Sequence, residues 1–430
     1  MKVAVIGAGI TGLTHAWSLK KKGFQVTVIE KEKRAGGWIQ TKREGDYLFE
    51  RGPRSCRAKG NGSATLKLVE DLGLQDEVIV ADKASKKRYL YLEGKLRQVP
   101  GGPLGLFTSP MMKGVPAALW RERKVPAGRE LDETIENFFT RRLGSHFTRS
   151  FIDPLITGIY AGDIATLSMK SCLPTLFEWE REAGSLIKGA FCSKKKRESV
   201  SPFVREVQKA GLFSFKNGME TLTDKLVDCL DGDILLGKAV TKITGDAQGV
   251  SLTVDGEELA FDRVVAAVPL DTMATLVGME KPSAIHWASM AVVNLGYREG
   301  SITPPGFGYL VPSKEKQQIL GCVWNSSVFP QQQKGGTALT VMIGGDHRKD
   351  FESLDAEKCK ELALSSLQDH MSIEAEPEVT DIFFAKAAIP QYHIGHAQVV
   401  DTVRQKFPYL QLLGSSYDGI AVNDCIATSF

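Results

Sequence analysis

The sequence predicts an α/β fold with three parts: a parallel sheet packed between helices, a mixed β-sheet, and an inserted helical lobe. Three observations predict it. The chain opens with strand, helix and strand patterns before residue 30. Residues 101–204 form a separate region, in which Gly and Pro are frequent from 101 to 116 and helical patterns dominate afterwards. Strand patterns then return, and a second block of strands spans about residues 288–345.

The opening segment contains a glycine-rich turn. Residues 2–6 are an apolar run that suits a strand buried on both faces of a parallel sheet, and residues 25–29 suit a second strand. Between them lies the pattern G-x-G-x-x-G, formed by Gly7, Ala8, Gly9, Ile10, Thr11 and Gly12. Because a helix follows at once, the pattern predicts a Rossmann-type dinucleotide site with the pyrophosphate at the helix N-terminus.

Each part of this motif has a physical role. Gly7 allows the tight turn, Gly9 lets the backbone approach the pyrophosphate, and Gly12 lets the helix pack against the strand. Glu30 ends the second strand and can accept hydrogen bonds from both ribose hydroxyls. Lys31, which follows it, is assigned to the same cofactor site.

The next residues decide between FAD and NAD. Arg34-Ala35-Gly36-Gly37-Trp38 resembles the R-x-G-G segment of the FAD-dependent amine-oxidase superfamily, in which the chain crosses the dinucleotide a second time. Its arginine lies near the phosphates or supports the turn. Gly52, Pro53, Arg54 and Ser55 follow at the spacing at which that superfamily passes the flavin ring. The predicted cofactor is therefore FAD.

Composition excludes other classes of protein. The net charge of +3 does not suggest a nucleic-acid partner. The seven cysteines contain no C-x-x-C pair, which favours reduced thiols in a cytoplasmic protein. The chain begins directly with a strand, so we expect no signal peptide and no secretion. No apolar run reaches the length of a membrane span.

Two segments of the helical lobe have the character of membrane-surface contacts. Residues 103–120 are apolar and end beside basic residues, and residues 194–197 are all basic. Apolar surface beside basic residues binds anionic lipid. The alternatives are packing of 103–120 against the lobe's own core and a solvated loop at 194–197. In the same lobe, Asp132 is expected to cap a helix that Gly144 ends.

Later segments resemble one family over nearly the whole chain, the oxygen-dependent protoporphyrinogen oxidases. The segments similar to its motifs are Gly36-Gly37-Trp38, Gly52-Pro53-Arg54, Asp153-Pro154-Leu155 with Gly158 to Asp163, Ser214 to Met219, Ile389-Pro390-Gln391-Tyr392 with Gly395-His396, and Ser416 to Val422. Two positions depart from the family. Ala397 stands where tryptophan is frequent, and Asn217 replaces a glycine, which a left-handed turn position would tolerate.

The resemblance implies a reaction and a substrate site. The family removes six electrons and six hydrogens from a porphyrinogen, and dioxygen becomes hydrogen peroxide. Arg88 matches the arginine that pairs with a propionate of the tetrapyrrole. Gly158 matches a position whose backbone approaches the substrate. The residues matched to the apolar sandwich around the macrocycle are Leu310, Val323 and Met342, which would otherwise be interpreted as strand core.

The resemblance also completes the cofactor site. Val240 matches a residue whose backbone contacts the adenine. Ile420, Ala421 and Val422 begin the last helix, whose backbone N–H groups would reach the electron-rich edge of the flavin. The sequence names no general base. It predicts no metal site, because the close pair His393 and His396 has no acidic or cysteine partner nearby.

These readings define the expected organisation. The FAD-binding domain comprises residues 1–80, 205–275 and 396–430, the substrate domain 81–100 and 276–395, and the helical lobe 101–204. The expected reaction converts protoporphyrinogen IX to protoporphyrin IX. Three alternatives stay open: coproporphyrinogen III as substrate, another flavin amine oxidase or desaturase, and a protein that binds FAD or porphyrin without turnover. A homodimer and peripheral attachment to the inner face of a membrane are compatible with the sequence.

Overall fold

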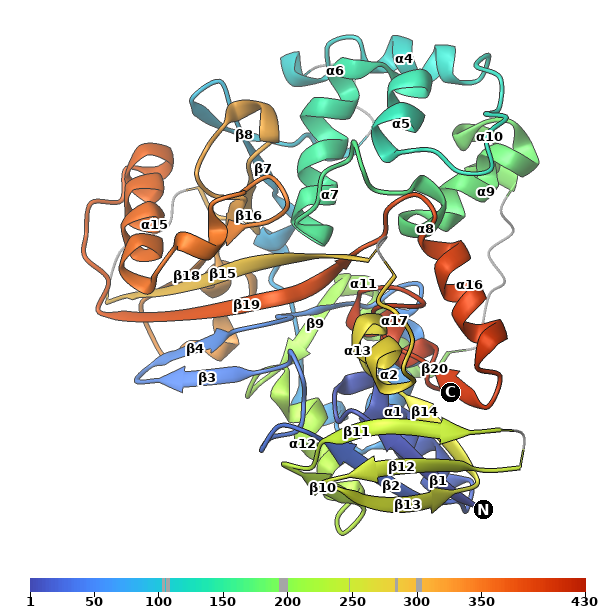
Figure 1. The fold of residues 1–430 in the computed structure, drawn as a ribbon. Helices are drawn as coiled ribbons and strands as arrows, with labels where there is room; N and C mark the ends of the chain where they lie inside the picture. The colour runs from blue at the N-terminus through green and yellow to red at the C-terminus, as the bar shows by residue number, and fades with distance from the viewer. Residues whose placement is uncertain (103–104, 106–108, 193–199, 247, 283–284, 299–303) are drawn as a thin grey trace. The chain divides into compact units, whose positions relative to one another are not determined.

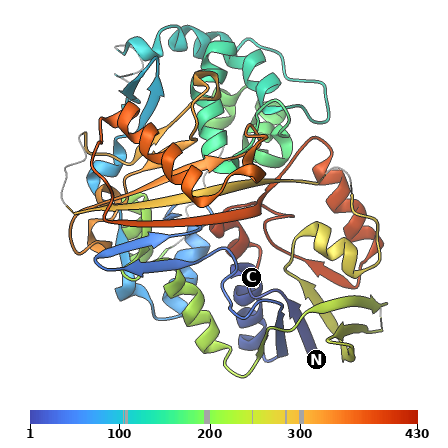
Figure 2. The same ribbon diagram turned by 60° about the vertical axis from the view of Figure 1, so that its left-hand side comes forward.

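The chain divides into two compact units, each assembled from segments far apart in the sequence (Figure 1, Figure 2). This computed structural model describes all residues except 103–104, 106–108, 193–199, 247, 283–284 and 299–303. The first unit comprises Met1–Ala81, Val200–Ile285 and Ala397–Phe430. The second comprises Asp82–Ser199 and His286–His396. The predicted α/β class is confirmed.

The first unit is built on a five-stranded parallel sheet in the order β10-β2-β1-β14-β20. Its strands are β1 (Lys2–Ile6), β2 (Gln25–Glu30), β10 (Ile234–Leu236), β14 (Arg263–Ala266) and β20 (Leu410–Leu412). Helix α1 (Ile10–Lys21) connects β1 to β2, as the opening pattern predicts. Both faces of β1 are buried, with Val3 and Val5 in one core cluster and Ala4 and Ile6 in another. This two-sided burial explains why the strand is an uninterrupted apolar run.

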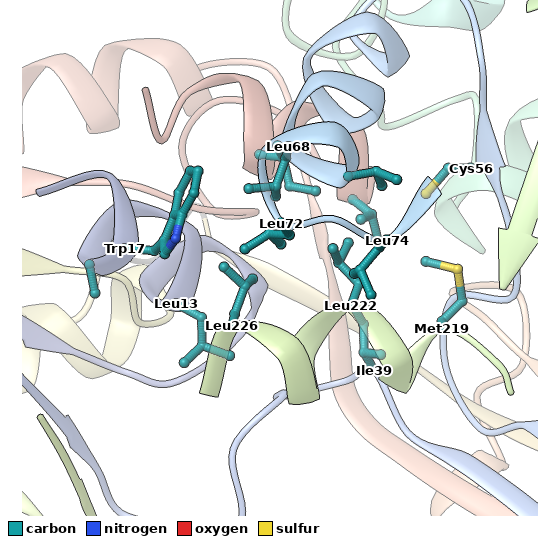
Figure 3. Close-up of a cluster of buried hydrophobic side chains, with 14 of the residues drawn as sticks. Leu13, Trp17, Ile39, Cys56, Leu68, Leu72, Leu74, Met219, Leu222 and Leu226 are labelled. Carbon is teal, nitrogen blue, oxygen red and sulfur yellow. The ribbon is translucent and has the colours of Figure 1, made fainter. Parts of the chain in front are cut away.

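Helices from the N-terminal, middle and C-terminal segments of the first unit cover one face of this sheet. They are α1, α2 (Gly62–Asp71), α12 (Glu220–Cys229) and α17 (Val422–Ala427). Figure 3 shows Leu13 and Trp17 of α1 beside Leu226 of α12 and Leu68 of α2. The Ser429 hydroxyl donates to the Thr11 carbonyl, 3.2 Å away, and so ties the C-terminus to α1.

Smaller sheets and helices complete the first unit. They are the hairpin β3 (Thr41–Glu44) and β4 (Tyr47–Glu50); the sheet of β5 (Cys56–Arg57), β9 (Leu212–Phe215) and β6 (Val78–Val80); the sheet of β11 (Val240–Gly245), β12 (Val250–Val254) and β13 (Glu257–Phe261); and helices α11 (Pro202–Ala210), α13 (Leu270–Leu276) and α16 (His396–Lys406). Asp255 and Gly256 form the turn between β12 and β13. Both residues have positive φ, +50° and +88°, as a type I′ turn requires.

The second unit contains a seven-stranded mixed sheet in the order β19-β15-β18-β17-β16-β7-β8. Its strands are β7 (Tyr89–Leu92), β8 (Lys95–Gln98), β15 (His286–Tyr297), β16 (Gly308–Leu310), β17 (Gly321–Val323), β18 (Thr337–Gly344) and β19 (Val379–Gln391). Only the pair β16 and β7 is parallel. Helix α15 (Ala356–Met371) covers one face, where Cys359, Ala363 and Leu367 share a core with strand residues such as Val341.

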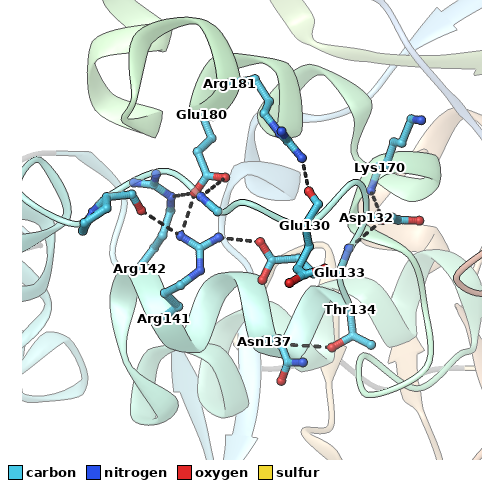
Figure 4. A network of polar contacts seen from close by, with 12 residues as sticks. Glu130, Asp132, Glu133, Thr134, Asn137, Arg141, Arg142, Lys170, Glu180 and Arg181 are labelled. Carbon is cyan, nitrogen blue, oxygen red and sulfur yellow. Dashed lines mark hydrogen bonds and ion pairs between the residues drawn. The ribbon is translucent and has the colours of Figure 1, made fainter.

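The helical part of the second unit surrounds a buried ion-pair network. Its helices are α4 (Val115–Glu122), α5 (Ile135–Leu143), α6 (Ser145–Phe147), α7 (Asp153–Tyr160), α8 (Met169–Cys172), α9 (Pro174–Ala183) and α10 (Leu186–Cys192), and α14 (Asn325–Val328) follows later in the chain. Arg142 of α5 is fully buried and pairs with Glu180 of α9 and with Glu122 of α4 (Figure 4 shows Arg142 and Glu180). The network joins three helices through one guanidinium.

The prediction that Asp132 caps α5 is wrong. The cap is Thr134, whose hydroxyl accepts the Asn137 N–H, while Gly144 ends the helix as predicted. Asp132 instead accepts hydrogen bonds from the Ser168 hydroxyl and the Lys170 N–H, 2.6 and 3.2 Å away. Its carboxylate joins two segments of the lobe, a partnership that local sequence does not reveal.

The predicted membrane contacts fall partly outside the described residues. This holds for most of 103–108 and for 194–197. Within the described residues, Trp120 is 60% exposed and lies 4.2 Å from the Lys124 ammonium, whereas Met112 is buried. No described helix combines the length and the apolar character needed to cross a bilayer. Contact with a membrane surface stays a prediction.

Candidate active site

The glycine-rich turn has a close-packed side and an open side. A Cβ atom on Gly12 would lie 1.9 Å from the Gly7 carbonyl oxygen, so no side chain fits there. A Cβ atom on Gly9, by contrast, would have no atom of the described residues within 4 Å. Gly9 is also the N-cap of α1, where backbone N–H groups lack helical acceptors. The open space therefore lies where an anionic group is favoured.

Glu30 is tied to this turn. One carboxylate oxygen accepts the Ala8 N–H at 2.7 Å, and the other accepts the Glu32 N–H at 2.9 Å. Because a carboxylate offers about four acceptor positions, Glu30 keeps capacity for ribose hydroxyls. Lys31 is exposed, and its ammonium lies 3.8 Å from the Glu32 carboxylate. The Lys238 N–H donates to the Glu30 carbonyl, which brings Val240, two residues on, near the same strand end.

The second loop packs against the glycine-rich turn. The Gly36 N–H donates to the Ala8 carbonyl at 2.7 Å, and a Cβ atom on Gly37 would lie 3.1 Å from Gly9 Cα. The Arg34 guanidinium donates to the carbonyl oxygens of Gly37 and Ile39, at 2.7 and 2.6 Å. Arg34 was expected either to lie near the phosphates or to support the turn. These two hydrogen bonds are consistent with support of the turn. Trp38 is 43% exposed.

The third loop packs against the second. A Cβ atom on Gly52 would lie 1.8 Å from the Trp38 carbonyl oxygen, and the Arg51 N–H donates to the Gln40 carbonyl at 2.9 Å. Pro53, Arg54 and Ser55 follow, each partly buried. The second loop therefore packs backbone against backbone on the glycine-rich turn, and the third loop packs in the same way on the second. This cradle fits the adenosine diphosphate part of FAD, because phosphates can approach main-chain N–H groups without meeting side chains.

The C-terminal segment also reaches this cradle. The nearest atoms to a Cβ atom placed on Gly414 belong to Thr11, at 3.5 Å and beyond. Helix α17 begins at Val422 with Ala421 as its N-cap, directly after the partly buried Ile420. The Ala421 N–H is 3.3 Å from the Asp424 carboxylate. Contact between this helix start and the flavin edge stays a prediction.

Leu310, Val323 and Met342 lie on one face of the mixed sheet. Leu310 pairs with Gly321, and Gly321 pairs with Met342, so the two side chains flank a glycine on the same face. Val323 is two residues after Gly321 and therefore shares that face. This is the face opposite α15, since the intervening residues, such as Cys322, belong to the α15 core. The register thus brings three predicted substrate residues together.

Gly158 faces this apolar surface from α7. A Cβ atom on Gly158 would lie 2.8 Å from a methyl group of Leu310. The helix is preceded by a π-helical turn, Thr148–Ile152, and Pro154 explains it. Proline lacks the N–H for the helical ladder and clashes with the carbonyl four residues earlier, so the helix widens there.

Arg88 lies at the edge of the same surface. It immediately precedes β7, and Leu90, two residues on, pairs with Leu310, so alternation directs Arg88 to that face. The residue is exposed, and its guanidinium carbon is 5.1 Å from the centre of the Phe307 ring. All five predicted substrate residues therefore belong to one face of the sheet or to the helix against it. Their contact with a substrate stays a prediction.

Two segments that resemble the family's motifs pack against each other. The Gln391 amide donates to the Tyr160 carbonyl at 2.8 Å, and the Ser168 N–H donates to the Tyr392 carbonyl at 2.7 Å. Asp153 accepts both the N–H and the hydroxyl of Ser313, at 2.7 and 2.9 Å. Burial raises the pKa of Asp153, although these hydrogen bonds oppose the shift. The segments hold α7 in place.

The explanation offered for Asn217 is wrong. The left-handed residue of this turn is Gly218, with φ at +90°, and Asn217 is not among the residues of positive φ. The Gly218 N–H closes the turn on the Phe215 carbonyl at 3.0 Å. Asn217 thus occupies the third position of the turn, which many side chains tolerate in a type I turn.

The two close histidines have different neighbours. The His393 ring lies 4.5 Å from the His286 ring, and the His396 ring stacks on Tyr392 at 4.2 Å. Burial and the neighbouring His286 lower the pKa of His393. Among the described residues, no group of three or more His, Cys, Asp and Glu side chains is arranged to hold a metal ion.

Sequence reasoning missed a polar row on the same sheet face. The Asn325 amide donates to the Thr340 hydroxyl at 2.7 Å, and this hydroxyl donates to Asn294 at 2.6 Å. The Asn294 amide then donates to the buried Asp381 carboxylate at 3.2 Å. Thr340 pairs directly with Val323, so the row borders the apolar surface. Polar residues inside otherwise apolar strands were the available signal.

Comparisons with known proteins agree with this geometry. The family model for flavin containing amine oxidoreductases matches residues 10–429. A protoporphyrinogen oxidase from Bos taurus is 34% identical over 99% of this chain and 96% of its own length. A coproporphyrinogen III oxidase from Bacillus subtilis is 30% identical over 99% and 95%, respectively.

Solved structures show the same fold. A crystal structure of a protein from Exiguobacterium matches with a TM-score of 0.82 and 24% identity, over 100% of this chain and 96% of that one. Putrescine oxidase bound to putrescine matches with a TM-score of 0.69 and 16% identity, over 100% and 97%. With the matched family model and the three-loop cradle, these findings place the chain in the flavin containing amine oxidoreductase family, as an oxidoreductase whose cofactor is FAD.

Proposed function

We propose that this protein is an oxidase that converts protoporphyrinogen IX to protoporphyrin IX, with dioxygen reduced to hydrogen peroxide. The observation that carries the proposal is the meeting of Leu310, Met342 and Gly158 on one apolar surface with Arg88 at its edge. An apolar wall suits the largely apolar tetrapyrrole macrocycle, and a guanidinium suits a propionate. When bound, FAD supplies the acceptor for two electrons at a time. Three such passes remove six electrons and six hydrogens and consume three dioxygen molecules.

The chain's own residues supply position rather than proton transfer. In this proposal the first unit holds FAD through its three loops, and the second unit holds the substrate through its sheet face. Leu310 and Met342 exclude water from one side of the macrocycle, and Gly158 lets the α7 backbone approach it. Exclusion of water from the reacting carbon limits side reactions. Arg88 fixes the rotation of the ring by binding one carboxylate.

Coproporphyrinogen III is the second candidate. The relative from Bacillus subtilis, which is 30% identical, carries the name coproporphyrinogen III oxidase. That substrate carries four propionates rather than two and would favour more cations on the face of Arg88. Arg97 pairs with Leu90 across the β7–β8 hairpin and so lies on the face of Arg88. Its charge is matched by the Glu93 carboxylate at 2.5 Å. This pairing favours the substrate with fewer carboxylates.

Anaerobic mixing of the FAD-loaded protein with each porphyrinogen tests the proposal. We expect protoporphyrinogen IX to bleach the visible flavin band faster than coproporphyrinogen III does. Porphyrin fluorescence and hydrogen peroxide should then appear when oxygen is admitted. Faster bleaching by coproporphyrinogen III would reverse the choice of substrate. If neither bleaches the flavin, the reaction class is wrong and amines or polyenes become the substrates to test.

Replacing Arg88 tests the carboxylate anchor. We expect Arg88→Ala to raise KM for protoporphyrinogen IX roughly 10- to 100-fold, because a hydrogen bond to a charged group contributes about 1.5–3 kcal/mol. The FAD content per chain should not change, because Arg88 lies in the second unit. Arg97→Ala is the matched control, since that guanidinium is already paired with Glu93. An Arg88→Ala enzyme with unchanged KM would remove Arg88 from the substrate site.

A further inference from the structure

A buried carboxyl lies behind the flavin loops. Glu50 ends β4, two residues before Gly52, and is only 4% exposed. One oxygen accepts the Met219 N–H at 2.7 Å, and the other accepts the Thr41 hydroxyl at 2.9 Å. Met219 is the N-cap of α12. The Glu50 carboxyl therefore joins the β3–β4 hairpin to the start of a helix about 170 residues away in the sequence.

The same contacts extend to the second loop. The Glu220 carboxylate accepts the Thr41 N–H and the Arg34 guanidinium, each at 3.2 Å. Arg34 in turn holds the Gly37 carbonyl of the loop that crosses Gly9. One chain of hydrogen bonds thus runs from Glu50 through Thr41 and Glu220 to the loop against the dinucleotide turn.

The side chains around Glu50 are tightly packed. A Cβ atom on Gly218 would lie 2.8 Å from a Glu50 carboxyl oxygen and 2.3 Å from a Thr41 methyl carbon. Gly218 also has φ at +90°, which suits glycine. The Ser214 to Met219 segment therefore fits against the hairpin only while Glu50 and Thr41 keep their positions.

We propose that Glu50 is a positioning residue for the flavin: its carboxyl holds the Gly52–Ser55 loop, the Arg34–Trp38 loop and the start of α12 as one surface for the cofactor. The proposal rests on the FAD site and not on the identity of the substrate. Glu50 touches neither substrate nor reacting atoms in this role, and it acts through the loops that it fixes.

The carboxyl should also make FAD binding depend on pH. Burial raises the pKa of Glu50 to about 8, against the opposing hydrogen bonds from Met219 and Thr41 and the charge of Arg54, while Glu220 raises it further. The folded protein therefore binds this proton more tightly than the unfolded chain does, and stability falls as pH rises from the usual glutamate range through about 8. Deprotonation places a second negative charge beside Glu220, which disfavours the joined arrangement of the loops.

The test measures the FAD dissociation constant of refolded or stripped apoprotein by flavin fluorescence, without porphyrinogen. We expect Glu50→Ala to weaken FAD binding about tenfold or more at pH 7, because a buried N–H and a hydroxyl lose their partner. Glu50→Gln should stay within about threefold of the parent protein, since the amide oxygen still accepts the Met219 N–H. Glu44→Gln is the matched control, because Glu44 lies on the same hairpin, exposed and paired with Lys42.

A second readout separates positioning from general stability. If Glu50 only stabilised the fold, Glu50→Ala would lower the melting temperature of the apoprotein and leave FAD affinity unchanged, which would overturn the proposal. If Glu50→Ala does not fold, the pH profile decides. FAD affinity of the parent protein should fall through about pH 8, and Glu50→Gln should abolish that step. If Glu50→Gln retained this fall in FAD affinity, the proposal would be overturned. A failure of the protein to oxidise porphyrinogens would not affect these binding results.

Discussion

Gly9→Val is expected to give a folded protein that does not retain FAD through purification. A side chain fits at this position, because no atom of the described residues lies within 4 Å of a Cβ atom there. The backbone angles at Gly9, φ −74° and ψ 176°, are also open to any residue. The valine methyl groups would occupy the space through which the pyrophosphate approaches the backbone. Loss of two charge-assisted hydrogen bonds, about 1.5–3 kcal/mol each, corresponds to roughly a hundredfold weaker binding or more.

Gly12→Ala is the matched contrast within the same motif. Its Cβ atom would lie 1.9 Å from the Gly7 carbonyl oxygen, so the helix has to move away from the strand. We expect this smaller substitution to lower the melting temperature strongly, while the larger one at Gly9 leaves the apoprotein stable. Circular dichroism melting and flavin absorbance per chain measure the two effects. A Gly9→Val protein that keeps its flavin would contradict the assignment of the loop, and one that fails to fold would contradict the open space.

The dinucleotide cradle was predictable because its signals are local. The turn from Gly7 to Gly12 and the strand end at Glu30 are read within one βαβ unit, and their geometry follows from short-range sterics. Glycine at these positions indicates directly where the backbone comes close to another group. The structure places Gly36 and Gly37 against Ala8 and Gly9, and their predicted crossing of the dinucleotide stays a prediction.

The substrate face was predictable only through the family resemblance. Leu310, Val323 and Met342 look like core residues of strands, because both faces of their strands are largely buried. Their meeting depends on the register of β16, β17 and β18, which hydrogen bonds between distant segments set. Nothing in the periodicity of a three-residue strand such as β17 states which face it buries.

The polar contacts were the least predictable part. Glu50 meets Met219, and Asp132 meets Ser168, across separations that no local pattern encodes. Glu50 belongs to a four-residue strand buried throughout, where a carboxyl is unexpected. Such a residue signals a buried partner, and the tertiary structure alone identifies it.

Arg142→Leu is expected to destabilise the helical part of the second unit by about 3–5 kcal/mol, because removal of one member of a buried ion pair leaves an uncompensated charge. Arg142 and Glu122 are both fully buried. Among the described residues, the Glu122 carboxylate would keep the Ser185 hydroxyl and the Leu186 N–H, at 2.7 and 2.8 Å. Glu180 would still pair with Arg141. The midpoint of thermal unfolding should fall by roughly 6–20 °C for a unit of this size.

Two further variants test whether the loss of stability comes from the buried charge of Glu122. Arg149→Leu removes an exposed ion pair with Glu136 in the same lobe, with the arginine side chain 65% exposed, and should cost less than about 1 kcal/mol. The double variant Glu122→Leu with Arg142→Leu removes both buried charges and should recover much of the loss, since well-packed apolar residues replace such pairs at little cost. An Arg142→Leu protein as stable as its parent would mean that water or a rearranged side chain compensates the charge of Glu122. A double variant less stable than the single one would instead mean that the shape of the pair, rather than its charge, holds the three helices together.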